Sequence, residues 1–269
     1  MFKLCLIIGS GKLPLEILKS YNKDEVFIVA LKEAEISFQL LQGFQIEVMS
    51  VFKVGKIMKT IKSKGIKNIC FVGGLKKPSF SSVKPDFTGF LLLLKLLKLK
   101  LKGDDAVLQT VIKFVESKGF TIQSATEVAP EILIHKGILT KSKPSKEDEK
   151  TYELGFEILE GISKFDIGQA IVIQEGVVIG VEAIEGTDAL IERCGLLKYS
   201  SKNLPILVKS AKINQTLKID MPVIGLETIK NLIKNGFAGV VIKAGSSIII
   251  EKEECIKMAN ENNLFIVGK

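Results

Sequence analysis

Short apolar runs alternate with amphipathic stretches through the first half of the chain. The spacing of Val54, Ile57, Met58 and Ile61 predicts a helix over about 54–64 whose other face carries lysines. Runs that end at glycine or polar residues predict buried strands, which we place at 3–8, 26–31, 46–48, 69–72 and near 119–123. Strands that alternate with helices indicate a parallel sheet covered on both sides, as in Rossmann-like domains.

The second half shows a different order of elements. A helix over about 148–162 comes first, followed by strands 170–174 and 177–183, which Glu175-Gly176 joins as a hairpin. Helices and strands then alternate to the end, so we expect a mixed α/β domain. The charged, proline-containing stretch 141–150 reads as a linker between domains at 1–140 and 151–269.

Charge supports the division into two parts. Residues 1–140 contain 21 lysines and 12 acids, a net charge of +9, whereas residues 141–269 contain 17 basic residues and 18 acids, a net charge of −1. The basic half favours an anionic partner. Few aromatic residues accompany the lysines and no nucleic-acid motif occurs, so we expect no nucleic-acid partner.

Cysteines and hydropathy indicate where the protein works. The four cysteines are scattered without a CxxC pair, which is typical of reduced cytosolic thiols. No apolar run is long enough for a membrane span, and the first residues lack the features of a signal peptide. We therefore expect a cytoplasmic protein.

Two glycine turns follow predicted strands of the first half. Gly9-Ser10-Gly11-Lys12-Leu13-Pro14 is neither GxGxxG nor a Walker A loop, yet a strand, a Gly-x-Gly turn and a helix start form a generic phosphate cradle. The alternative is a tight turn without a ligand. Gly73-Gly74-Leu75-Lys76-Lys77 ends another strand in the same manner. Since loops at the carboxyl ends of parallel strands converge, both turns are expected to face the same ligand.

The stretch Phe90–Lys102 has an unusual composition, FLLLLKLLKLKLK. On a helix Lys95, Lys98 and Lys102 share one narrow face and leucines cover the remainder, so one interpretation is a core helix with a solvated lysine stripe. The other is an apolar surface that meets lipid or acyl chains.

Acids gather in Val181–Leu190, where Glu182, Glu185 and Asp188 follow an apolar strand. Thr187 can cap the next helix, so one interpretation is a capped helix beside a solvated turn. The other is a Mg²⁺ or Mn²⁺ site. Further acids and amines stand at element ends of the second half, namely Asp166, Asp220, Lys209 and Lys212.

Carboxylates and amines together suit metal-assisted phosphate or pyrophosphate hydrolysis. A nucleotide-dependent oxidoreductase, or a nucleotide-sugar binding protein without catalysis, is the alternative.

The motifs GSGKLP (9–14), GGLKKP (73–78), GDDAVL (103–108), DIGQA (166–170), VEAIEGTDAL (181–190) and IDMPVIGLET (219–228) occur in the order of one family. With them the chain resembles the LpxI-type UDP-2,3-diacylglucosamine pyrophosphatases of lipid A biosynthesis. The resemblance implies hydrolysis of UDP-2,3-diacylglucosamine to lipid X (2,3-diacylglucosamine 1-phosphate) and UMP with a Mg²⁺-type ion. It also implies two domains with the ligand in the cleft between them, and work at the inner face of the inner membrane.

Carried onto this sequence, the resemblance makes Asp220, Asp188 and Glu185 the expected catalytic and metal-binding acids. Lys77 and Lys218 stand where the family usually has arginine, which keeps the charge but loses the bidentate fork. The residues expected to bind substrate are Gly9, Ser10, Gly11, Lys12, Leu13, Gly74, Lys76, Lys77, Gln169, Thr187, Lys209 and Lys212.

Overall fold

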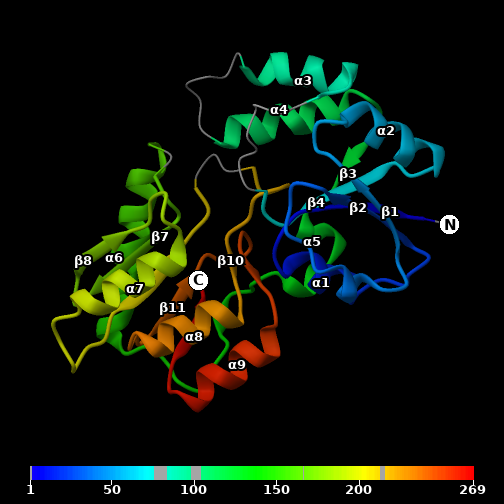
Figure 1. Cartoon of the computed structure of the whole chain (residues 1–269). Coiled ribbons are helices and arrows are strands. Elements are labelled where there is room, and N and C mark those ends of the chain that lie inside the picture. Colours follow the sequence, from blue (N-terminus) through cyan, green and yellow to red (C-terminus); the bar gives the residue numbers. More distant parts are fainter. Residues whose placement is uncertain (1, 76–83, 98–103, 166, 213–215) are drawn as a thin grey trace. The chain divides into compact units, whose positions relative to one another are not determined.

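The protein consists of two compact units, which the computed structural model describes over residues 2–75, 84–97, 104–165, 167–212 and 216–269 (Figure 1). The units are Met1–Pro130 and Glu131–Lys269, so the boundary lies before the one predicted at residue 140. Residues 131–140 belong to the second unit because Ile134 N donates to Ser247 O and strand β6 (Gly137–Ile138) pairs with β13 (Phe265–Gly268). Helix α6 (Lys146–Ser163), which the Ser145 hydroxyl caps, begins within the predicted linker 141–150.

The first unit is a five-stranded parallel sheet in the order β3-β2-β1-β4-β5, which confirms the predicted Rossmann-like sheet. Figure 1 shows α2, α3 and α4 on one side of this sheet and α1 and α5 on the other. Its elements are β1 (Leu4–Ile8), α1 (Leu13–Leu18), β2 (Val26–Leu31), η1 (Phe38–Leu41), β3 (Gln45–Met49), α2 (Val54–Ser63), β4 (Asn68–Val72), α3 (Phe87–Leu97), α4 (Asp104–Glu116), β5 (Thr121–Ile122) and α5 (Ala125–Val128).

The strand order of the first unit reverses at β1. The chain runs from β1 outward to β3 and then returns to β4 on the other side of β1. Loops after β1 and β4 therefore leave the sheet side by side at its switch point, where open α/β sheets bind their ligands. Both predicted glycine turns lie there.

The second unit is built on a mixed six-stranded sheet in the order β6-β13-β11-β9-β7-β8, as expected for a mixed α/β domain. A separate parallel pair, β10 and β12, stands beside it. In addition to β6, β13, α6 and η3 (Pro130–Ile132), its elements are β7 (Ala170–Gln174), β8 (Val177–Val181), α7 (Thr187–Leu197), β9 (Ile206–Lys209), β10 (Val223–Ile224), α8 (Leu226–Lys234), β11 (Gly239–Ile242), β12 (Ile248–Ile249) and α9 (Lys252–Glu261).

The predicted hairpin is confirmed. Strands β7 and β8 pair antiparallel, and the two turn residues, Glu175 and Gly176, both have positive φ angles, of 48° and 79°. Such a two-residue turn matches the right-handed twist of the flanking strands.

The second unit has a core on each face of its sheet. Alternate residues of a strand point to opposite faces, so on β9 Leu207 packs with α7, α8 and α9, whereas Ile206 and Val208 pack with α6. The same alternation directs the next residue, Lys209, to the face of Leu207. A lysine thereby enters the side of the sheet that α7 covers.

Helix α3 differs from the expectation that leucines would bury most of its girth. Its described residues run from Phe87 to Leu97, and among them only Gly89 and Leu92 are buried. The rest of the predicted helix, 98–102, lies outside the described residues. Within the described chain, no helix has the length and apolarity to cross a membrane.

The close approach of the two glycine loops gives a stability prediction. A Cβ on Gly9 would lie 2.2 Å from the backbone O of Gly74, whereas a Cβ on Gly74 would meet nothing within 4 Å. We expect Gly9→Ala to lower the free energy of unfolding by about 1–3 kcal/mol, as overpacking does, and Gly74→Ala to leave it almost unchanged. Chemical denaturation of both variants measures the difference, and equal midpoints would contradict this account of the loops.

Candidate functional site

The two glycine loops of the first unit are bonded to each other. Ser10 N donates to Gly74 O at 2.7 Å and Gly74 N donates to Ser10 O at 2.8 Å, while Gly9 N donates to Val72 O. The Ser10 hydroxyl in turn accepts from Glu35 N at 3.0 Å. The structure therefore brings Gly9, Ser10 and Gly74 together, as the convergence of strand ends predicted.

The hollow beside these loops is small. It encloses about 40 Å³ and is lined by Ile8, Gly9, Gly11, Pro14, Leu15, Ile36, Ser37 and Leu41. A volume of that size holds about one water molecule. This hollow is too small for a nucleotide, and the described parts of the two turns close on each other through backbone bonds.

Helix α1 gives the first loop little of the predicted cradle. It has only six residues, and Lys12, at its N-cap position, makes no side-chain cap bond. Lys12 is exposed and Leu13, where the helix begins, is half-buried. Lys76 and Lys77 lie outside the described residues, so their predicted substrate contacts remain predictions.

The second unit contains two buried charges close to each other in the fold. The side chains of Lys209, at the end of β9, and Glu182, directly after β8, are 4% and 5% exposed. Burying a charge is costly unless it is paired and hydrogen-bonded. The contacts that compensate these two residues therefore determine the local structure.

Thr187 connects the two charges. Its hydroxyl donates to Glu182 Oε1 at 2.6 Å and accepts from Lys209 Nζ at 2.8 Å, and Nζ also donates to Val223 O at 3.2 Å. The predicted cap is wrong, because Gly186 occupies the N-cap position and the Thr187 hydroxyl bonds to the side chains of Glu182 and Lys209. Thr187 thus fixes the first turn of α7 to the ends of β8, β9 and β10.

Gln169 completes this network from the turn before β7. Its backbone N donates to Glu182 Oε2 at 2.9 Å, and its own side-chain Oε1 is buried without a hydrogen-bond partner in the described part of the chain. The turn needs Gly168, which has a φ of 45° and lies so close to Glu182 O that a Cβ would be 2.0 Å away. This unsatisfied oxygen makes Gln169 a candidate for a hydrogen bond to a ligand.

Further carboxylates act on the Lys209 amine. Burial lowers the pKa of Lys209, and the charges of Glu182, Asp188 and Asp220 oppose that shift. Asp188 lies in the first turn of α7 and Asp220 precedes β10, and both are exposed. The structure therefore gathers two predicted acids, Asp188 and Asp220, around one predicted amine.

Glu185 lies apart from this group. Its carboxylate accepts from Ala183 N and from two nitrogens of Arg193, the nearer at 2.9 Å, and Arg193 also donates to Val181 O. Hydrogen bonds from the backbone and from Arg193 hold the pKa of Glu185 below its usual value. This geometry favours an anchoring role for Glu185, and its role as a metal ligand stays a prediction.

The acids do not form a preassembled metal cage. Among the described residues, no group of three or more His, Cys, Asp or Glu side chains is close enough to hold a metal ion. Mg²⁺, however, is often bound by one or two carboxylates together with substrate phosphates and waters. Asp188 and Asp220 fit that kind of ion, one that arrives with a phosphate.

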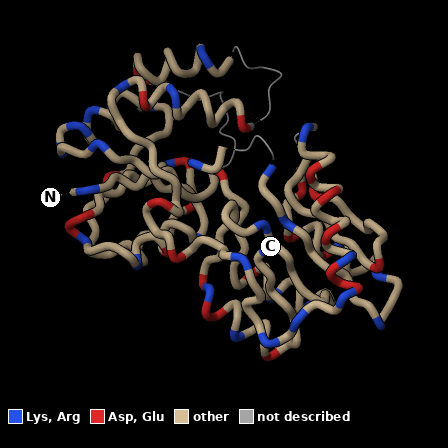
Figure 2. The backbone as a smooth tube through the Cα atoms, turned by 180° about the vertical axis from the view of Figure 1, so that it is seen from behind, with Lys and Arg blue, Asp and Glu red and all other residues tan. Residues whose placement is uncertain are grey.

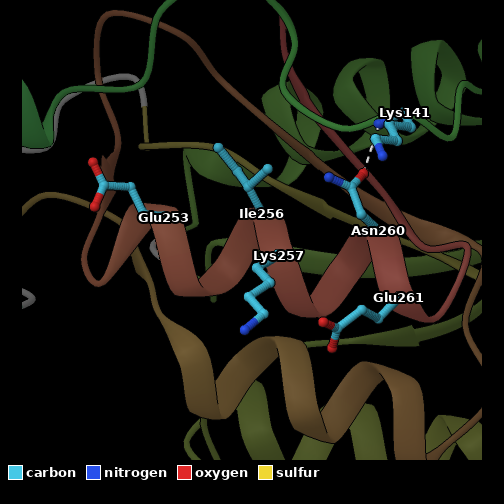
Figure 3. Close-up of a pocket in the computed structure, with 6 residues that line it drawn as sticks. All are labelled: Lys141, Glu253, Ile256, Lys257, Asn260 and Glu261. Atoms are coloured by element: carbon cyan, nitrogen blue, oxygen red, sulfur yellow. Dashed lines mark hydrogen bonds between the residues drawn. The ribbon is translucent and has the colours of Figure 1, made fainter.

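A larger hollow lies elsewhere in the second unit. It has a volume of about 450 Å³ and is lined by Lys141, Glu253, Ile256, Lys257, Asn260 and Glu261, with Lys141 N donating to Asn260 Oδ1 (Figure 3). None of the predicted site residues lines it. We therefore assign the site to the network around Lys209 and not to this hollow.

The sequence analysis left Glu182 out of the expected catalytic acids, yet its carboxylate is the acceptor at the centre of the network. The signal was available in the strand, because Glu182 follows buried Gly180 at an interval of two. Gly168, Arg193 and the carbonyl of Val223 were not predicted, since their roles depend on contacts between distant segments. Lys212 is half-buried just after β9, and its predicted substrate contact stays a prediction.

A Rossmann-like sheet followed by a mixed α/β domain with a lysine, carboxylates and a glutamine side chain at strand ends defines a two-domain α/β protein suited to a phosphate-bearing ligand. Comparison with known proteins identifies the family. The model of the LpxI N-terminal domain matches residues 3–132 and that of the LpxI C-terminal domain matches residues 135–267, so the chain belongs to the LpxI family.

A relative from Caulobacter vibrioides is similar along its whole length. It carries the name UDP-2,3-diacylglucosamine pyrophosphatase LpxI and is 33% identical over 273 residues, which span 100% of this chain and 98% of the relative. The resemblance inferred from the motifs is therefore confirmed at the level of the family.

The bridge through Thr187 can be tested without a substrate. Thr187→Val keeps the shape of the side chain but leaves Glu182 Oε1 and one N–H of Lys209 without their partner. We expect the free energy of unfolding to fall by about 1–3 kcal/mol, the cost of unsatisfied buried polar groups, and Thr187→Ser to recover most of it. Urea denaturation at neutral pH measures both, and full stability of Thr187→Val would contradict the bridging role.

Proposed function

We propose that this protein hydrolyses the pyrophosphate bond of UDP-2,3-diacylglucosamine and releases 2,3-diacylglucosamine 1-phosphate and UMP, as a step of lipid A biosynthesis. The observation that carries the proposal is the end-to-end similarity to the Caulobacter vibrioides relative of that name. The second unit adds a site whose groups suit a pyrophosphate. A substrate with two acyl chains resides in a membrane, so we place the enzyme in the cytoplasm at the inner face of the inner membrane.

The described residues divide the chemical work between binding and positioning. Lys209 supplies positive charge that would stabilise charge developing on the phosphate oxygens. Glu182 and Thr187 are positioning residues, because they hold the Lys209 amine and the first turn of α7 in place. The Gln169 amide is the group we propose for a hydrogen bond to the substrate.

Asp188 and Asp220 are the residues we propose to hold a Mg²⁺ or Mn²⁺ ion. Such an ion, when bound with the substrate, would neutralise phosphate charge and lower the pKa of a water molecule. Glu185 is left out of this set because its carboxylate is bound to Arg193. Water then attacks the phosphorus on the sugar side, the bond from that phosphorus to the bridging oxygen breaks, and UMP leaves.

The first unit takes a smaller part in this proposal. The glycine loops and Lys12 remain candidates for contacts with the substrate. An oxidoreductase is disfavoured, since Pro14 occupies the place of the third glycine of a dinucleotide loop. A nucleotide-sugar binding protein without catalysis would share the contacts but release no UMP.

Hydrolysis in ¹⁸O-labelled water tests the activity and the direction of attack together. With UDP-2,3-diacylglucosamine in detergent micelles we expect UMP release, with the label on 2,3-diacylglucosamine 1-phosphate and none on UMP. Mass spectrometry of the two products measures this. Label on UMP would reverse the direction of attack, and absence of turnover would favour the binding protein.

The metal proposal predicts a linked response to chelation and to loss of an acid. EDTA should stop UMP release and added Mg²⁺ or Mn²⁺ should restore it, while Asp220→Asn should lose activity by about 1000-fold or more and not recover with Mg²⁺. Asp24→Asn, at an exposed turn of the first unit, is the matched control and should keep full activity. If EDTA did not affect turnover, the proposed metal requirement would be wrong. If Asp220→Asn were active, Asp220 would not belong to the catalytic site.

A further inference from the structure

Helix α3 exposes apolar side chains where an ordinary surface helix exposes mostly polar ones. Phe87, Phe90, Leu91, Leu94 and Leu97 recur at i, i+3, i+4, i+7 and i+10 and therefore share one face, which we call the α3 apolar face. These five side chains are exposed, by 77%, 47%, 38%, 42% and 47%. The buried side consists of Gly89 and Leu92.

Polar contacts hold α3 with this face outward. The Asp86 carboxylate accepts from Gly89 N at 2.8 Å in the first turn of α3 and from Lys56 N at 2.9 Å in the first turn of α2. The only charged residue of the described helix, Lys95, extends its amine over the ring of Phe114 in α4, at 5.3 Å. These polar contacts tie the helix to α2 and α4, while the five side chains of the α3 apolar face remain in contact with solvent.

An apolar face of this kind is uncommon on a soluble domain and marks an interaction site. The net charge of the sequence segment that contains this face indicates the partner. Residues 53–118, which include α2, α3 and α4, contain 15 lysines and four acids, a net charge of +11, so the remaining residues of the +8 chain carry −3. Figure 2 shows lysines along α2, whereas α3 is uncoloured by charge over most of its length.

We propose that the α3 apolar face docks this protein onto an anionic lipid bilayer, with the surrounding lysines, including Lys56 and Lys59 of α2, facing the lipid phosphates. An exposed apolar helix face within a basic region is what an interfacial membrane contact requires. A second copy of the chain fits less well, because two segments of charge +11 would repel each other. The inference deepens the proposed function, since it names the surface that would reach a membrane-resident substrate.

Vesicles without any nucleotide sugar test the docking separately from the enzyme. We expect the full-length protein to sediment with vesicles of phosphatidylcholine and phosphatidylglycerol, and to bind pure phosphatidylcholine vesicles at least about tenfold more weakly. High salt should reduce the difference, because it screens the lysines. Equal binding to both kinds of vesicle, or to neither, would overturn the proposal, whatever the hydrolysis assay shows.

Substitutions on α3 test whether the α3 apolar face makes the contact with the bilayer. Phe90→Gln with Leu94→Gln should lower binding to the anionic vesicles by about tenfold or more, because two exposed apolar side chains are lost from the contact. The matched control is Leu196→Gln with Leu197→Gln at the end of α7, which removes two exposed leucines from the other unit and should bind as the wild type does. Lys56→Gln with Lys59→Gln should weaken binding several-fold and reduce its salt dependence.

Folding and self-association are controlled in the same samples. Circular dichroism should show that all variants are folded. Phe87→Ser, at the most exposed position of the α3 apolar face, is a second variant that removes less apolar surface. Unchanged vesicle binding of both α3 variants would overturn the proposal. So would a dimer of the wild type that these substitutions dissociate without an effect on lipid binding, because the face would then serve a second copy.

Discussion

The buried amine of Lys209 is the constraint on which the second unit depends. Its position in β9 directs it into the face that α7, α8 and α9 cover, where a lone charge would be costly. Thr187, Glu182 and the carbonyl of Val223 compensate it and thereby fix three strand ends and the start of α7 relative to one another. The charges of Asp188 and Asp220 also act on this amine, so one lysine organises the packing around the acids that we propose for the chemistry.

The two units differ in the groups that they present at their strand ends. The first uses the reversal of strand order at β1, which sets the loops after β1 and β4 side by side, and these loops then close on each other through backbone bonds. The second unit uses buried charge at strand ends and leaves the side-chain oxygen of Gln169 without a hydrogen-bond partner among the described residues. This contrast explains why we assign charge stabilisation to the second unit and a smaller role to the glycine turns.

Helix α3 links the enzyme's proposed chemistry to the place where the substrate resides. Its anchoring through Asp86 and Lys95 uses the polar atoms for attachment and leaves the apolar side chains outward. In an ordinary globular protein this arrangement would be a liability for aggregation. Beside a lysine-rich region it is instead suited to a bilayer surface.

The sequence by itself determined the elements, the parallel sheet, the hairpin at Glu175-Gly176 and the family, because these depend on periodicity, turn residues and ordered motifs within short stretches. It placed the acids and amines at element ends but left Glu182 out of the expected catalytic acids and allowed Thr187 a capping role. Only the tertiary structure decided these points, since burial of Glu182, its bond to Thr187 and the diversion of Glu185 to Arg193 depend on segments far apart in the chain. The orientation of α3 was equally out of reach of periodicity, which identifies an apolar face but cannot tell whether the fold covers it.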